Sequence, residues 1–188
     1  NEQDNAHETI SHALKLDYPN FEVIAINDGS SDNTKEILNE LALKYDKLRV
    51  VHLAENQGKA MALQAGSLLT DAEYLIGIDG DALLDSHAAQ WMIRHFIDHP
   101  TVAAVTGNPR IRTRSTLLGR IQVGEFSSIV GMIKRAQSTF GRLFTVSGVI
   151  TAFRKSAVHE VGYWSPNMLT EDIDVTWKLH RAGWEVRF

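Results

Sequence analysis

The 188-residue sequence contains no cysteine, so disulfide bonds and thiolate metal sites are excluded. This absence fits a reducing compartment. A basic excess is also lacking, because the formal net charge is −4. A dedicated nucleic-acid-binding protein usually carries many more lysines and arginines, so we expect no nucleic-acid partner. No apolar run is long enough to span a bilayer and no secretory signal opens the chain, which predicts that this chain by itself is soluble.

Hydrophobic residues make up 44% of the chain, and a length of 188 residues suits a single domain. Short apolar runs alternate with helical patterns over the first 107 residues. The predicted strands are residues 21–26, 48–53, 74–78 and 102–106. This alternation predicts βαβ units, and therefore an α/β fold with a mostly parallel central sheet and helices on both faces.

The pattern changes after Gly107. Arg110, Arg112 and Arg114 alternate along an extended stretch, which could line a phosphate or sugar path, although such a run is more often a solvated face. An amphipathic helix is expected next. Residues 144–155 then predict a strand pair or a bulged strand, and residues 171–182 predict a helix.

Both ends of the sequence are abrupt. The chain starts without methionine and leads quickly into a helical pattern, and its last residues read as a strand that is still forming. Natural termini usually fade into polar residues. We therefore expect a fragment of a longer protein.

An aspartate and a turn follow the first predicted strand. Asp28 precedes Gly29 and a helix, so its carboxylate could bind a nucleoside while the helix N-terminus favours an anionic ligand. Asp, Gly and Ser also dominate turns for purely local reasons. The motif alone favours neither interpretation.

A second acidic turn, Asp79-Gly80-Asp81, follows the strand at residues 74–78. Gly80 allows close backbone approach, so the two carboxylates can converge on one ion. Mg²⁺ or Mn²⁺ is typically held by one or two carboxylates together with substrate phosphates. The alternative is a solvated acidic turn, but the position at a strand end favours a metal site.

A third acidic pair, Glu171-Asp172, opens a predicted helix behind Thr170. The helix dipole and an N-cap explain such residues without any function. The functional alternative makes one of them a general base. Lys59, at the start of another helix, could meet a phosphate or simply face solvent.

Five segments follow one another along the chain: IAINDGSSDNT, NQGKAMALQAG, IDGDALLD, SGVITAFRK and MLTEDID. Their order resembles that of family 2 glycosyltransferases with the GT-A fold. The resemblance extends over essentially the whole chain and is closest to processive membrane synthases such as hyaluronan, chitin and cellulose synthases. Within these, the C-terminal stretch is most similar to bacterial poly-β-1,6-N-acetyl-D-glucosamine synthases of biofilm formation.

The resemblance implies an inverting transferase that moves a sugar, N-acetylglucosamine by analogy, from a UDP-sugar to an oligosaccharide acceptor. Residues 1–107 would form the nucleotide-sugar-binding half of one catalytic domain and residues 108–188 the acceptor half. The nucleotide-sugar would be bound by Asp28, Asp79, Lys59 and Glu2. Asp81 and Asp79 would hold Mg²⁺ or Mn²⁺, Ser147 and Gly148 would shape the acceptor site, and Asp172, beside Glu171, would be the catalytic base.

The resemblance also implies a membrane-embedded parent at the cytoplasmic face of the bacterial inner membrane, with a possible accessory subunit. Two departures stand out. The family's first strand, with its proline and aromatic residue, and its Q-x-x-R-W motif are both missing from these residues. We therefore expect weak UDP binding and little or no polymerase activity from the 188 residues alone.

Three other functions compete with this interpretation. A non-catalytic nucleotide-sugar-binding or regulatory domain would keep Asp28 and the sheet but would need no base. A metal-dependent phosphohydrolase could also use aspartates at strand ends. A dinucleotide oxidoreductase is the weakest alternative, because no G-x-G-x-x-G follows a strand.

Overall fold

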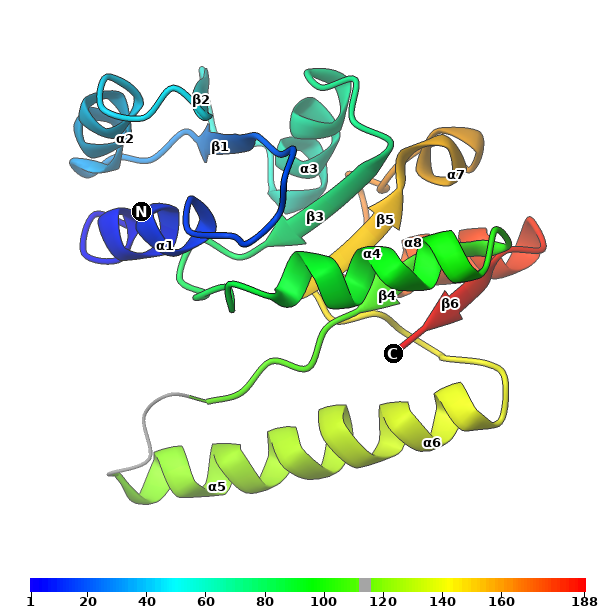
Figure 1. Ribbon diagram of the computed structural model, residues 1–188. Coiled ribbons are helices and arrows are strands. Elements are labelled where there is room, and N and C mark those ends of the chain that lie inside the picture. The colour runs from blue at the N-terminus through cyan, green and yellow to red at the C-terminus, as the bar shows by residue number, and fades with distance from the viewer. Residues whose placement is uncertain (112–115) are drawn as a thin grey trace.

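The computed structural model describes residues 1–111 and 116–188, in which the strands form two sheets (Figure 1). The smaller sheet is a parallel pair, β1 (Val23–Asp28) and β2 (Leu48–Leu53). The larger sheet has the order β3-β5-β4-β6. Its strands are β3 (Tyr74–Ile78), β4 (Val102–Thr106), β5 (Ile150–Arg154) and β6 (Glu185–Arg187).

Strand direction in the larger sheet is parallel except for β5. This strand is antiparallel to both β3 and β4, whereas β4 and β6 are parallel. Residues 144–155, predicted as a strand pair or a bulged strand, contain one described strand, β5, because residues 141–149 approach the sheet as an irregular segment. The expectation of a mostly parallel α/β fold is confirmed, with a single reversed strand between β3 and β4.

Helices lie between successive strands of the chain, and three further helical segments form a rod apart from the sheet. The first half holds α1 (Ala6–Ala13), α2 (Thr34–Ala42), α3 (Lys59–Leu68) and α4 (Ala88–Asp98). A long rod then runs below the sheet in Figure 1, made of α5 (Leu117–Glu125), the π-helical η1 (Phe126–Ile133) and α6 (Lys134–Thr139). The last two are α7 (Lys155–Glu160) and α8 (Glu171–Arg181).

The core surrounds β4, whose five residues are all buried. On one face, α4 contributes Met92, Ile93 and Phe96, which share one side of the helix because they follow helical spacing. On the other face, Val158 of α7 and Val175 of α8 belong to a second apolar cluster. The expected helices on both faces are therefore present around this strand.

A cavity of about 920 Å³ is lined by residues of both β1 and β3, and no pairing joins these two strands in the described chain. Leu63 and Gly66 of α3 also line it, and one end reaches Asp28 and Asp79.

Among the described helices, none combines the length and the apolar character needed to cross a membrane.

Candidate active site

Asp28 ends β1 and holds the turn that precedes α3. Its two carboxylate oxygens accept hydrogen bonds from the main-chain N–H groups of Gln57 and Gly58, each at 2.8 Å. The side-chain amide of Asn56 donates to the Asp28 carbonyl at 3.2 Å. Asp28 therefore joins the end of β1 to the turn before α3, whereas the local interpretation expected it to cap its own turn; there the Ser30 N–H donates to Asn27 Oδ1 instead. Its role toward a nucleoside stays a prediction.

The acidic turn follows β3 directly. The Asp79 N–H donates to the Val149 carbonyl, and the Ala82 N–H donates to the Asp79 carbonyl, both at 3.1 Å. These bonds fix the turn, in which Asp79 is half-buried and Asp81 is exposed.

The N-terminal segment lies against the same turn. A Cβ atom built on Gly80 would be 3.1 Å from Cγ of Glu2, and the Thr9 hydroxyl donates to the Gly80 carbonyl at 2.9 Å. The Glu2 N–H in turn donates to the Thr34 hydroxyl of α2 at 2.8 Å. The fold therefore brings Glu2 beside the acidic turn, which sequence spacing alone does not imply.

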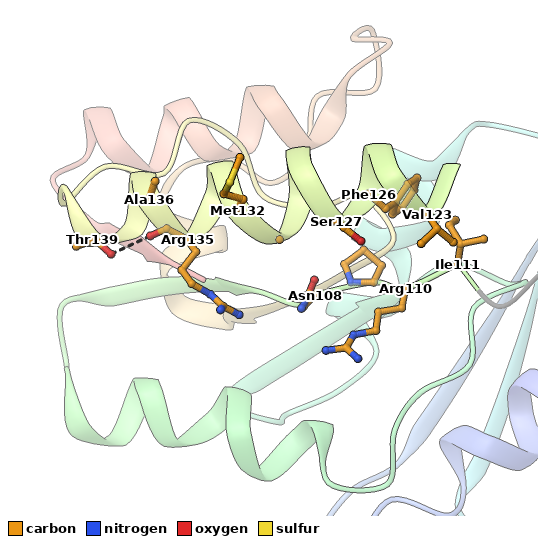
Figure 2. Close-up of a pocket in the computed structure, with 12 residues that line it drawn as sticks. Asn108, Arg110, Ile111, Val123, Phe126, Ser127, Met132, Arg135, Ala136 and Thr139 are labelled. Carbon is orange, nitrogen blue, oxygen red and sulfur yellow. Dashed lines mark hydrogen bonds between the residues drawn. The ribbon is translucent and has the colours of Figure 1, made fainter. Parts of the chain in front are cut away.

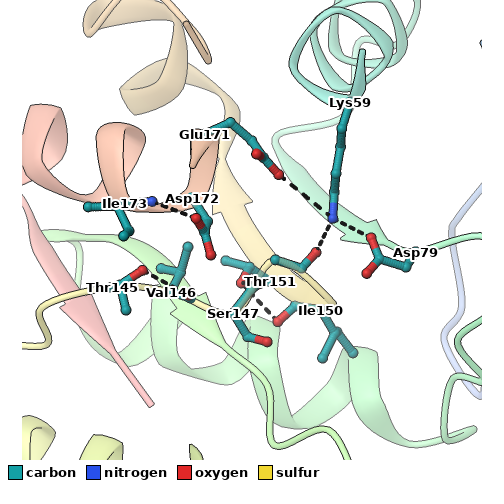
Figure 3. A network of polar contacts seen from close by, with 11 residues as sticks. Lys59, Asp79, Thr145, Val146, Ser147, Ile150, Thr151, Glu171, Asp172 and Ile173 are labelled. Carbon is teal, nitrogen blue, oxygen red and sulfur yellow. Dashed lines mark hydrogen bonds and ion pairs between the residues drawn. The ribbon is translucent and has the colours of Figure 1, made fainter. Parts of the chain in front are cut away.

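Lys59 is the centre of the polar network in Figure 3. Its ammonium forms an ion pair with Asp79 and donates to the Gly148 carbonyl at 2.6 Å. It also lies 3.8 Å from the Glu171 carboxylate. One lysine thus contacts a donor-side carboxylate and two groups of the expected acceptor half.

Asp172 lies on the first turn of α8, next to Glu171. Its Oδ1 accepts from the Ile173 N–H at 2.9 Å. A Cβ atom built on Gly148 would be 3.5 Å from both Asp172 Oδ2 and Lys59 Nζ, so this glycine keeps the space between them narrow but open. Thr170 is the N-cap residue as expected, although its side chain makes no capping bond within the described chain; its φ of −124° and ψ of 71° are not those of a standard cap.

Ser147 is held in place by the sheet. Its N–H donates to the Thr106 hydroxyl at 2.7 Å, and its carbonyl accepts from Thr151 at 2.8 Å. The preceding Val146 N–H donates to the Thr176 hydroxyl of α8 at 3.0 Å. Residues 146–148 are therefore fixed between β4, β5 and α8, which places Gly148 under Asp172.

Arg110 is the member of the arginine run that lies within the described residues. Arg110 lines a cavity of about 570 Å³ between the extended segment 108–111 and the helical rod, together with Arg135 (Figure 2). Arg112 and Arg114 lie outside the described residues. That this run lines a phosphate or sugar path stays a prediction.

Sequence reasoning missed Lys134, a lysine that is 7% exposed at the start of α6. Burial lowers its pKa to about 8, and the negative charge of Asp172 partly opposes this shift. The charge of a second lysine therefore acts on the predicted base. The available sequence signal was its place in the apolar run FSSIVGMIK, where a charged residue is unusual.

Asp79 and Asp81 are the two residues predicted to hold a metal. No group of three or more histidine and acidic side chains is arranged around a common point in residues 1–111 and 116–188. Asp79 and Asp81 nevertheless supply carboxylate oxygens from one fixed turn, which suits Mg²⁺ or Mn²⁺ that is completed by phosphates and water. The two residues fit such an ion as part of a nucleotide complex.

Comparison with known proteins agrees with the resemblance. Residues 1–162 match the profile of glycosyl transferase family 2. A poly-beta-1,6-N-acetyl-D-glucosamine synthase of Staphylococcus epidermidis is 48% identical over 188 residues, which are 100% of this chain and 45% of that protein. One from Staphylococcus aureus strain MSSA476 is 46% identical with the same coverage. The chain thus spans less than half the length of these relatives.

Solved structures show the same fold. Mannosyltransferase PcManGT of Pyrobaculum calidifontis, in complex with GDP-Man and Mn²⁺, has a TM-score of 0.83 and 21% identity, covering 100% of this chain and 51% of its own. Residues 1–349 of S. aureus TarS, in complex with UDP-GlcNAc, have a TM-score of 0.67 and 18% identity, covering 95% and 50%. The predicted GT-A fold is therefore confirmed.

Proposed function

The chain belongs to glycosyl transferase family 2, and from that premise we propose that it is the catalytic region of an enzyme that extends a β-linked polysaccharide with N-acetylglucosamine from UDP-N-acetylglucosamine. The polymer would serve a biofilm or cell-surface matrix. The staphylococcal relatives, 48% and 46% identical, are named for such a synthesis and support this substrate class.

One observation carries the proposal: donor-side and acceptor-side groups converge on one point. Asp79 at the end of β3 and Glu171 at the start of α8 share Lys59, and Gly148 separates that lysine from Asp172. A transferase needs its donor and its base this close, because the two reactants must meet at bonding distance. A binding module needs no such convergence.

The proposed roles follow the geometry. Residues 1–107 would bind the nucleotide-sugar through Asp28, Asp79, Lys59 and Glu2, and residues 108–188 would bind the acceptor around Ser147 and Gly148. A divalent ion held by Asp79 and Asp81 would supply charge stabilisation for the leaving diphosphate.

The Asp172 carboxylate would take the proton of the acceptor hydroxyl. The hydroxyl oxygen would then bond to C1 of the sugar while the bond from C1 to UDP breaks on the opposite face. An α-linked donor would thus give a β-linkage. Glu171 would help to place Lys59.

The parent protein would be embedded in the bacterial inner membrane with its active site at the cytoplasmic face, and an accessory subunit would be a further partner. The 188 residues alone would bind UDP weakly and polymerise little.

The test is Asp172→Asn in the intact protein, with UDP release from UDP-N-acetylglucosamine and UDP binding by calorimetry as separate measurements. Loss of a general base typically costs about 10²–10⁴-fold in rate, while UDP binding is expected to persist. Asp98→Asn on the exposed end of α4 is the matched control. Unchanged turnover in Asp172→Asn would favour the non-catalytic alternative, and phosphate release without a sugar acceptor would favour a phosphohydrolase.

A further inference from the structure

Lys59 lies where an ammonium and a divalent cation would compete for the same carboxylate. Its ammonium pairs with Asp79, one of the two carboxylates that fit a metal. The Gly148 carbonyl at 2.6 Å and the Glu171 carboxylate at 3.8 Å also surround the ammonium. These side chains are only partly exposed, at 37% for Lys59 and 30% for Asp79, so solvent screens their charges incompletely.

We propose that Lys59 is a built-in counter-ion that occupies Asp79 until a nucleoside diphosphate arrives, so that the divalent cation binds well only together with the nucleotide. The inference rests on the proposed function in taking the ligand to be a metal nucleotide. It goes further by assigning to Lys59 control over when the metal enters.

The competition follows from charge and space. A metal bound to the Asp79 carboxylate and an ammonium in contact with that same group would repel each other at short range. A diphosphate removes the conflict, since it brings negative charge for both cations. Lys59 can then turn toward a phosphate oxygen, because its side chain is flexible and carries three N–H donors. Its place at the first residue of α3 favours this move, since a helix N-terminus attracts anions.

The same movement connects the two halves of the site. When the ammonium leaves its present position, it releases the Gly148 carbonyl and the Glu171 carboxylate together. Both groups adjoin Asp172, so the arrival of the donor would change the surroundings of the acceptor base. Lys59 is thus a positioning residue for the acceptor side as well as a binding residue for the donor.

The experiment measures Mn²⁺ binding to the intact protein by electron paramagnetic resonance, without nucleotide and then with UDP. A neighbouring charge typically changes proton binding to a carboxylate by about one to three powers of ten, and we take the same scale for metal binding. We therefore expect Lys59→Met to bind Mn²⁺ alone at least about tenfold more tightly than the wild type. With UDP present, this advantage is expected to vanish or reverse, because the variant lacks the lysine that contacts the phosphate.

Two further variants make the result specific. Lys59→Arg keeps the positive charge and is expected to bind Mn²⁺ alone as weakly as the wild type. Lys44→Met removes the same charge from an exposed position after α2 and is expected to change nothing. Circular dichroism checks that each variant is folded.

Unchanged or weaker binding of Mn²⁺ alone by Lys59→Met would overturn the proposal, as would an equal gain in Lys44→Met. Failure of the wild type to bind UDP with Mn²⁺ would count instead against the proposed function, because the metal-only comparison does not depend on the nucleotide.

Discussion

Gly29 offers a sharp test of how the nucleotide side of the site is built. It directly follows Asp28 and has a φ of +65°, a conformation that L residues with a Cβ atom rarely adopt. A Cβ atom built on it would be 2.6 Å from the carbonyl carbon of Glu55 and nearer still to the main-chain nitrogen of Asn56. Gly29→Ala would therefore create both backbone strain and a collision.

The backbone strain and the collision each contribute to the loss of stability in Gly29→Ala. The left-handed conformation costs a residue with a Cβ atom about 1–2 kcal/mol. Overpacking of a tight site typically adds about 1–3 kcal/mol, and here the neighbours are backbone atoms, so no rotamer change can relieve it. We expect a loss of about 2–5 kcal/mol in the free energy of unfolding, a large part of the roughly 5–15 kcal/mol of an ordinary domain.

Gly58→Ala is the matched control. Gly58 also has a positive φ, +87°, but a Cβ atom there would have no neighbour within 4 Å. The free energy of unfolding of this variant should fall only by the cost of the left-handed backbone conformation, about 1–2 kcal/mol. Urea unfolding of both variants, with comparison of midpoints and slopes, gives the two losses.

The Gly29 substitution should also affect the donor site. The main chain that it would displace continues into Gln57 and Gly58, whose N–H groups hold the Asp28 carboxylate. UDP binding should therefore weaken in Gly29→Ala even under conditions where the chain remains folded. Equal destabilisation of the two alanine variants would refute the steric argument.

Two further predictions concern charged groups inside the fold. Lys134 has a pKa of about 8 against an ordinary 10.5, so between pH 8 and 10 the unfolded chain binds more protons and wild-type stability should rise with pH. At pH 7, the free energy of unfolding of Lys134→Met should exceed that of the wild type by about 2 kcal/mol, and the difference should shrink toward pH 10. Urea unfolding at several pH values measures this, and a difference that stays constant with pH would contradict the prediction. Burial alone would raise the pKa of Asp174, but a hydrogen bond from Ser165 and the ion pair with Lys178 lower it. Asp174→Asn should therefore destabilise the chain by about 1–3 kcal/mol at pH 7. The wild type should lose this stability as the pH falls below the ordinary pKa of 3.8, and a loss confined to pH values above about 5 would contradict the assignment.

Local patterns predicted the strands of this fold better than their pairing. Residues 48–53, 74–78 and 102–106 are strands as expected, because short apolar runs rich in β-branched residues identify buried strands. The reversed direction of β5 was not predictable in this way. It depends on where the chain returns after the helical rod, and the strand pattern itself is the same for either direction.

The residues of the site likewise differ in whether local sequence patterns could predict them. Asp28 and Asp79 were predicted because each follows an apolar run, and the structure places both on the lining of one cavity although β1 and β3 belong to different sheets. The meeting of Lys59 with Glu171 was not predictable, since these residues lie far apart in the chain and no local signal couples them. The buried position of Lys134 likewise depends on how the rod packs, which its own apolar pattern does not specify.

The acidic start of α8 shows why a local explanation can be correct and still incomplete. Glu171 and Asp172 suit a helix N-terminus, where the dipole favours negative charge. That argument would apply equally on any solvent-exposed helix. Here the ammonium of Lys59 lies 3.8 Å from Glu171, and the charge of the buried Lys134 acts on Asp172. The helix dipole accounts for neither of these two contacts, because both come from lysines on other elements, so helix capping alone does not explain the surroundings of the acidic pair.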